Sequence, residues 1–300
     1  MPTPITPAAL RAAAVQVLTR IDQARSKVSS NWAKIAKKIT STGRSTLHSR
    51  MVDINQVERK GAGYKFGTLS SMAYEVVNDD WGLGIGIGVN DIKDDLLGLY
   101  DERLDLLAKR IEQFPDDGIF ALLRAGLTEL CIDGQAFFSD THYADPKNIT
   151  TANTFDNKLA LTLDATNYNT AYQKMLEFPD GKGRPMGLIP THLVVPPALR
   201  KTAKDIIQAS TISTGGENVN KGEVEVIVEP LLSADATTWY LLSCDAGMPF
   251  FVQEREALTT YVKNLPTDDN VFLDDEVLIL TKGRGEFGYG IPQRAIYSKP

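Results

Sequence analysis

Apolar side chains recur at every third or fourth position in several stretches of the chain, which is the periodicity of an α-helix. The first stretch spans residues 7–25, where Thr6-Pro7 supplies an N-cap and a proline at the first helical position. The leucine-rich stretch 91–127 predicts the longest helix, and Pro115 is expected to break or kink it because proline lacks a backbone donor. Shorter helices are predicted at 32–39, at 166–178 and from Pro196-Pro197 to about residue 210.

Short apolar or alternating runs bounded by turn residues predict strands in the second half of the chain. These runs lie at 192–195, 223–228, 239–242, 250–252 and 277–280. The predicted helices and strands do not alternate regularly. This order favours an α+β fold over a doubly wound parallel sheet.

Residues 46–90 combine short predicted strands with Gly-rich turns. In 82–88 apolar residues alternate with glycine, which gives a strand with one face stripped of side chains. Glycine weakens a strand unless another segment must come close to its backbone. Because isolated hairpins are marginal in water, we interpret 46–90 as a long β-hairpin arm that needs a partner surface.

Composition places the chain among ordinary globular proteins. It has 300 residues, of which 43% are hydrophobic and 23% charged, enough for one elaborated domain or two ordinary ones. No apolar run approaches the roughly 20 residues that a membrane helix needs, so we expect no membrane association. The only cysteines, Cys131 and Cys244, exclude a disulfide framework and favour a reducing cytosolic compartment.

The net charge of −6 is distributed unevenly. Residues 1–65 hold twelve basic and three acidic side chains, whereas residues 66–140 hold five basic and fifteen acidic ones. Either these are solvated faces, or the basic segment of one copy lies on the acidic segment of another, where opposite fields would fix the register. Duplex binding is disfavoured because the basic residues are dispersed and the whole chain is acidic.

The sequence offers few candidates for chemistry. Residues 283–288 match a dinucleotide-binding glycine pattern, but the helix that such a site requires does not follow, so a bend between strands is favoured. Cys131, Asp133 and His142 lie close in sequence, yet a buried structural cysteine is commoner than a nucleophile. Two cysteines and three histidines give no paired zinc spacing, and capping explains the acidic doublets better than a metal does. We expect no catalytic residue, cofactor or metal.

Several stretches carry the patterns of one known family. They are Asp91–Tyr100 as D-I-x-D-D-x-x-G-x-Y, Pro115-Asp116 leading to Gly126, Cys131–Phe138 as C-x-D-G-Q-x-F-F with His142 downstream, and Trp239–Leu242 with Pro249-Phe250 and Gln253–Arg255. In this order they resemble the major head subunit (gpT) family of Mu-like tailed phages. Ile189–Leu199 is similar to a feature of tailed-phage capsid proteins more widely.

The resemblance implies the α+β major capsid fold of tailed phages and herpesviruses. Applied to this chain, it implies an N-terminal arm at 1–45 and an extended β-hairpin loop at 46–90. A peripheral domain with a spine helix would take 91–154 and 263–300, and an axial domain would take 155–262.

The function implied by the resemblance is that of a major capsid protein without enzymatic activity. Copies would self-assemble into pentamers and hexamers of an icosahedral shell in the bacterial host cytoplasm, around double-stranded DNA that is not bound sequence-specifically. Scaffold, portal and head-maturation protease are the other implied partners, and the virion capsid is the implied location. The candidate subunit-interface residues are Arg50, Arg59, Lys60, Lys65, Trp81, Asp94, Asp95, Asp101, Glu102 and Asp105.

Two alternatives remain open from the sequence. One is a cysteine-dependent hydrolase that uses Cys131 and His142. The other is a different phage structural protein, such as a tail tube subunit or a scaffold.

Overall fold

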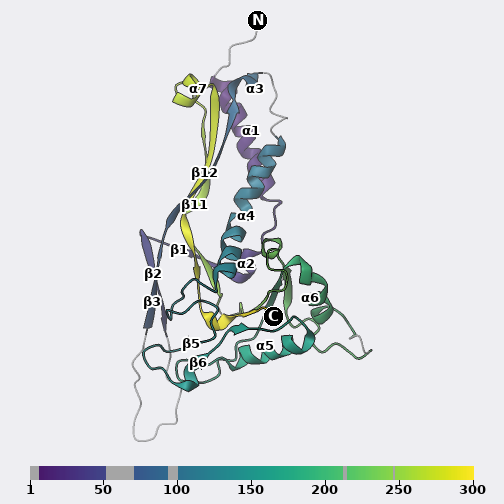
Figure 1. The fold of residues 1–300 in the computed structure, drawn as a ribbon. Coiled ribbons are helices and arrows are strands. Elements are labelled where there is room, and N and C mark those ends of the chain that lie inside the picture. The colour runs from purple at the N-terminus through teal and green to yellow at the C-terminus, as the bar shows by residue number, and fades with distance from the viewer. Residues whose placement is uncertain (1–6, 52–70, 94–100, 212–214, 246) are drawn as a thin grey trace, which may run out of the picture.

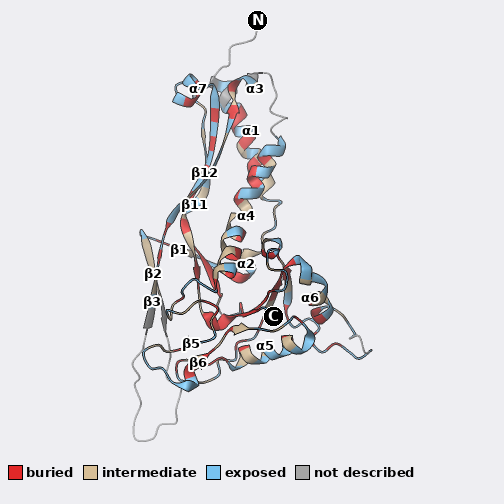
Figure 2. Cartoon of the chain, in the orientation of Figure 1, coloured by how far each residue is buried: buried red, intermediate tan, exposed pale blue. Residues whose placement is uncertain are grey.

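The computed structural model describes residues 7–51, 71–93, 101–211, 215–245 and 247–300. Its upper part is slender and is built from long strands with two helices beside them, and its lower part is broader (Figure 1). A separate two-stranded hairpin lies along one side. Buried residues follow the inner faces of these elements from the slender part into the broad part (Figure 2).

The slender part is organised by a four-stranded sheet in the order β1-β11-β12-β4. Its strands are β1 (Ala36–Thr40), β11 (Phe250–Lys263), β12 (Glu276–Tyr289) and β4 (Asp79–Gly88). Side chains alternate across it as a strand requires: Val277 and Ile279 are buried, whereas Leu278 and Leu280 are exposed on the outer face. At one end, α3 (Val89–Lys93) and α7 (Asp269–Leu273) form the tip.

Two helices cover the inner face of this sheet. Helix α1 (Pro7–Arg25) packs on α4 (Asp101–Ala125), and both bury apolar side chains against Ile87 and Ile279. The Arg20 guanidinium donates two hydrogen bonds, of 2.8 and 2.7 Å, to the Asp105 carboxylate. The pKa of Asp105 is lowered by this hydrogen bond and the Arg20 charge. Part of the charge complementarity that the sequence suggested between copies is therefore satisfied within one copy.

The broad part contains a five-stranded sheet in the order β7-β13-β10-β8-β9. Its strands are β7 (Lys158–Leu159), β13 (Ala295–Ser298), β10 (Trp239–Leu242), β8 (His192–Val195) and β9 (Glu225–Val228). The four residues of β10 are all buried because both faces are covered. Helices α5 (Ala165–Glu177) and α6 (Arg200–Ile207) cover one face, and α4 contributes to the core on the other.

The remaining strands are β2 (Ser45–Met51) with β3 (Ser71–Val77), and β5 (His142–Tyr143) with β6 (Thr154–Phe155). β2 and β3 pair antiparallel from Ser45↔Val77 to Met51↔Ser71. The predicted hairpin is thus present, but the glycine-rich strand 82–88 is not part of it. That strand lies in β4 and pairs with β12 along its whole length, which corrects the expected hairpin arm of 46–90.

Three other expectations are corrected by tertiary packing. The helix predicted at 32–39 ends after α2 (Trp32–Ile35), because the next residues pair with β11 as β1. Helix α4 continues through Pro115 and does not break there, since its two halves are each buried in a core cluster. The glycine pattern 283–288 is not a bend but part of the second half of β12. A Cβ at Gly288 would enter the ring of Phe251, so the strand needs glycine there.

The expected boundary between the axial and peripheral domains, at residue 262, does not coincide with the boundary between the two large sheets. β11, which was placed in the axial domain, lies in the four-stranded sheet. β13, which was placed in the peripheral domain, lies in the five-stranded sheet. The chain therefore crosses between the slender and broad parts once more than the expected boundaries imply.

Candidate functional site

Of the residues predicted to contact other copies, those that the structure describes are not gathered on one surface. Trp81 is half-buried and stacks on Phe287, with ring centroids 5.3 Å apart. Asp101 and Asp105 face Arg20 of the same chain, and Glu102 is exposed on the first turn of α4. Arg50 belongs to β2. The other candidates lie outside the described residues: Arg59, Lys60, Lys65, Asp94 and Asp95.

The tip carries an exposed apolar surface that the sequence analysis did not identify. Phe272 is 78% exposed and Leu273 is 71% exposed, both on the short helix α7. Asn270 and Val271 of the same helix are buried and hold it against the sheet. The fold thus presents two large apolar side chains to solvent from an anchored helix. We name Phe272 and Leu273 the tip pair.

The root of the β2–β3 hairpin is fixed to the body by buried polar side chains. Gln253 on β11 is fully buried, and its Oε1 lies 2.6 Å from Nε2 of His48 on β2. The Gln253 Nε2 donates to Val76 O and to Asn78 Oδ1. Asn78 in turn donates to Ser41 Oγ at 2.9 Å. These bonds hold the hairpin to the body near residues 41–48 and 76–78.

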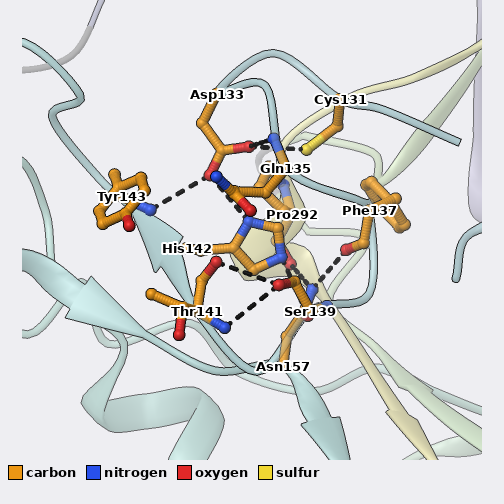
Figure 3. Close-up of polar contacts among 10 residues, drawn as sticks. All are labelled: Cys131, Asp133, Gln135, Phe137, Ser139, Thr141, His142, Tyr143, Asn157 and Pro292. Carbon is orange, nitrogen blue, oxygen red and sulfur yellow. Dashed lines mark hydrogen bonds and ion pairs between the residues drawn. The ribbon is translucent and has the colours of Figure 1, made fainter. Parts of the chain in front are cut away.

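Cys131, Asp133 and His142 come together in one buried cluster (Figure 3). Cys131 Sγ donates to Asp133 Oδ1 at 3.1 Å, and His142 Nδ1 lies 2.8 Å from Asp133 Oδ2. The backbone N–H groups of Gln135 and Tyr143 also donate to the Asp133 carboxylate, each at 3.1 Å. The carboxylate is thus the centre of the cluster.

Asn157 closes the cluster on the other side, and sequence patterns gave no sign of it. It is fully buried, and its Oδ1 accepts from Ser139 N–H at 3.0 Å and lies 3.1 Å from His142 Nε2. Its Nδ2 donates to the carbonyls of Phe137 and Pro292. The cluster therefore joins the 131–143 segment to the C-terminal segment near Pro292.

This geometry does not suit a cysteine nucleophile. Such a nucleophile needs a base that accepts its proton, but the Cys131 thiol faces a carboxylate and His142 lies on the far side of that carboxylate. Burial, together with the Asp133 charge, raises the pKa of the Cys131 thiol. The cavity of about 220 Å³ at the hairpin root is lined by Ile39, Tyr74 and Phe251 among others, and it includes neither Cys131 nor His142. The cluster therefore stabilises the fold by joining these segments.

Both thiols of the folded protein should resist an aromatic disulfide reagent at pH 8. Burial raises the pKa of Cys244 to about 12 and also raises the pKa of Cys131, so neither carries appreciable thiolate, which is the reactive form. Spectrophotometric titration should give no fast-reacting thiol in the native protein and two per chain after unfolding. A rapid native reaction that Cys131→Ala removes would instead support the hydrolase alternative.

Within the ranges that the structure describes, no helix is long and apolar enough to cross a lipid bilayer.

The sequence matches the Mu-like prophage major head subunit gpT family over residues 10–161, 155–232 and 233–300. The FluMu major head subunit of Haemophilus influenzae is 24% identical over 292 residues, covering 97% of this chain and 73% of that protein. The major capsid protein of Escherichia phage Mu is 22% identical over 305 residues, covering 76% of this chain and 99% of that protein.

The fold is also found in solved phage capsids. A chain of the bacteriophage JBD30 procapsid superposes with a TM-score of 0.62 at 22% identity, covering 99% of this chain and 76% of that one. A chain of the JBD30 capsid superposes with a TM-score of 0.59 at 20% identity, covering 69% and 92%. These likenesses confirm the expected α+β capsid fold. The chain therefore belongs to the Mu-like prophage major head subunit gpT family and is a major capsid protein.

Proposed function

We propose that this subunit forms an icosahedral shell of pentamers and hexamers around packaged double-stranded DNA, and that it has no enzymatic activity. The observation that carries the proposal is the β2–β3 hairpin, which forms a sheet of its own and is tied to the body at its root. An isolated hairpin gains order from a partner surface. A neighbouring copy supplies that surface, through the head-to-tail contacts that close rings.

The expected regions of the capsid fold are proposed with boundaries that follow the sheets. The long sheet with α4 serves as the peripheral domain and its spine, and the five-stranded sheet with α5 and α6 serves as the axial domain. The hairpin serves as the extended loop, and α1 as the N-terminal arm. Scaffold, portal and maturation protease are the proposed assembly partners in the host cytoplasm. The acidic net charge limits adhesion of the packaged DNA to the inner surface.

Among the predicted interface residues, Glu102 is exposed at the surface of the subunit, and its proposed role is a contact with another copy. Arg50, Arg59, Lys60 and Lys65 are proposed contacts of the hairpin segment, and Asp94 and Asp95 of the segment before α4. Asp101 and Asp105 contribute through their pairing with Arg20, which fixes the arm. Trp81 acts inside the subunit, where it packs on Phe114 and Phe287.

The tip pair provides a test of assembly that spares the fold. We expect the double substitution Phe272→Ser and Leu273→Ser to raise the concentration needed for assembly about tenfold to a hundredfold. Full burial of one such side chain contributes about 1.5–3 kcal/mol, so the two side chains, each half buried in the interface, contribute about 1.5–3 kcal/mol together. Each 1.4 kcal/mol is about tenfold. Light scattering against protein concentration measures this threshold.

The matched control is Val219→Ser, which removes a side chain that is 82% exposed and lies in the loop after α6. It should leave the threshold unchanged. All variants should keep the wild-type free energy of unfolding within about 0.5 kcal/mol, as for other exposed positions. An unchanged threshold in the tip variant would remove the tip pair from the proposed contacts.

A further inference from the structure

An apolar pocket lies at the root of the β2–β3 hairpin, where the hairpin meets β1 and β11. Its volume is about 220 Å³, and we name it the root pocket. Much of its wall is aromatic, and its lining includes Ile39, Tyr74, Met248, Phe250, Phe251 and Tyr289. An apolar cavity of about 150 Å³ is large enough to hold a benzene ring. The root pocket can therefore accept a phenyl side chain.

The tip pair is the matching apolar feature of the same chain. Phe272 and Leu273 are exposed on α7, so they gain most from burial against a partner. Asn270 fixes this helix from below, because its Nδ2 donates to the carbonyls of Lys263 and Glu276 at the ends of β11 and β12. The two apolar side chains are thus held in place before any partner arrives.

The tip pair cannot reach the root pocket of its own chain. β11 begins at Phe250, which lines the pocket, and ends at Lys263 beside the tip. A strand rises about 3.3 Å per residue, so this strand holds the two features about 40 Å apart. Figure 1 shows α7 at the upper end of the slender part, far from the hairpin. A tip pair that enters a root pocket therefore belongs to another copy.

The charges around the two features are opposite. The segment 264–276 holds five acidic residues and no basic one, and the segment 34–50 holds five basic residues and no acidic one. Of these basic residues, Lys34 and Lys38 are paired within the chain. Lys37 lines the pocket, is exposed, and has no ion-pair partner among the described residues. Opposite fields of this kind steer two surfaces together and fix their register.

We infer that the tip pair of one copy inserts into the root pocket of a second copy, with the acidic residues of the tip beside Lys37. The inference rests on the proposed shell-forming function and names the surface that receives the tip pair. The aromatic wall suits the Phe272 ring, and the Met248 thioether packs well against such a ring. Because the tip and the pocket are different surfaces, the contact is head-to-tail, which is the kind that closes rings.

Contact between two tip pairs is the competing arrangement. It would bury the same apolar side chains, but it would also bring the acidic residues of two tips together, and like charges across an interface are costly. The root pocket has acidic neighbours too, since the pKa of Tyr74 is raised by burial and by nearby charges that include Glu129 and Glu286. Lys37 gives the β1 edge of the pocket the opposite charge. The pocket is therefore the favoured partner of the tip.

Cross-linking inside assembled shells tests the contact directly. Leu273→Cys copies and Ile39→Cys copies are assembled together and treated with an oxidant or with a short bismaleimide. A denaturing, non-reducing gel should then show dimers that contain one copy of each variant. Copies that carry both substitutions should give a ladder of larger multimers, because every copy both gives and receives the contact. Cys131 and Cys244 are buried and should not react.

The control replaces Ile39→Cys by Val219→Cys, at a position that is 82% exposed and has no proposed contact. It should give no dimers with Leu273→Cys. Dimers from Leu273→Cys alone would show tip-to-tip contact and overturn the inference, as would shells that lack the cross-link to Ile39→Cys. If the wild type forms no shells, the proposed function fails and the inference fails with it. If Ile39→Cys does not fold, the exposed Lys37→Cys takes its place.

Charge reversal gives a second readout. Lys37→Glu should raise the concentration needed for assembly about twofold to fivefold, which is the range of an exposed ion pair. Asp274→Lys, at an exposed position of the tip, should do the same, and the two together should restore the wild-type threshold. Lys201→Glu is the control, because Lys201 pairs with Asp205 on α6, away from both features. Equal thresholds for Lys37→Glu and the double variant would contradict the inference.

Discussion

Replacing residues 52–70 by a two-residue turn is expected to abolish shell formation while the subunit still folds. The β2–β3 register places Met51 opposite Ser71, so a two-residue turn can close the shortened hairpin. The polar root at His48, Asn78 and Gln253 lies outside the replaced segment and is retained. Each copy repeats the lost contact around the shell. A loss of about 3 kcal/mol per subunit raises the concentration needed for assembly about a hundredfold.

Sedimentation velocity measures this effect, with the far-ultraviolet circular dichroism of the same samples as a check on folding. The control shortens a loop that has no proposed contact, namely residues 212–216 after α6, whose flanking residues Thr211 and Glu217 pair antiparallel and can be joined by a two-residue turn. It should assemble like the wild type. A hairpin-shortened protein that forms shells at the wild-type concentration would show that the hairpin is not an assembly element.

Asp133→Asn should lower the free energy of unfolding by about 3 kcal/mol, because hydrogen bonds to a charged group contribute about 1.5–3 kcal/mol and this buried carboxylate accepts several of them. The substitution keeps the shape of the side chain but removes the negative charge that lies beside Nδ1 of His142. It also weakens the bonds from Gln135, Tyr143 and Cys131. Equilibrium unfolding in urea measures the difference.

The same experiment at acid pH has a defined direction, because the stabilisation by Asp133 depends on its ionisation. The folded pKa of Asp133 is lowered to about 2, so its stabilisation is present above the ordinary carboxyl pKa of about 4. That stabilisation should be lost as the pH falls from about 4 to 2, and Asp133→Asn should lack this loss. Asp140→Asn is the control, because Asp140 pairs with Lys158 at the surface and contributes at most about 1 kcal/mol. Equal stability of the two variants would contradict the role given to Asp133.

The periodicity of apolar residues correctly predicted those elements whose structure is determined by their own side chains. The helices predicted at 7–25 and 166–178 are confirmed as α1 and α5, since an amphipathic face and a start signal are both encoded locally. Elements decided by distant partners were predicted less well. β4 was placed on the hairpin because its glycine alternation does not reveal that β12, nearly 200 residues later, pairs with it. Helix α4 passes Pro115 because both halves are buried.

The same division applies to the sites. Cys131, Asp133 and His142 were visible as chemistry-bearing residues in one short stretch, and the structure brings them together. Their order, with the carboxylate between thiol and imidazole, could not be derived from spacing. Asn157 gave no signal at all, because a single asparagine has no motif. Phe272 and Leu273 were not identified from the sequence, because two adjacent apolar residues carry no pattern that distinguishes an exposed position from a buried one; the fold exposes them at the tip.

Electron microscopy of the purified, unmodified protein at high concentration tests the central claim most directly, namely that this chain is a building block that completes its fold against copies of itself. Closed shells, rings or tubes built from the one chain are the predicted result. A uniform monomer at high concentration, with the β2–β3 hairpin folded against its own body, would contradict the account.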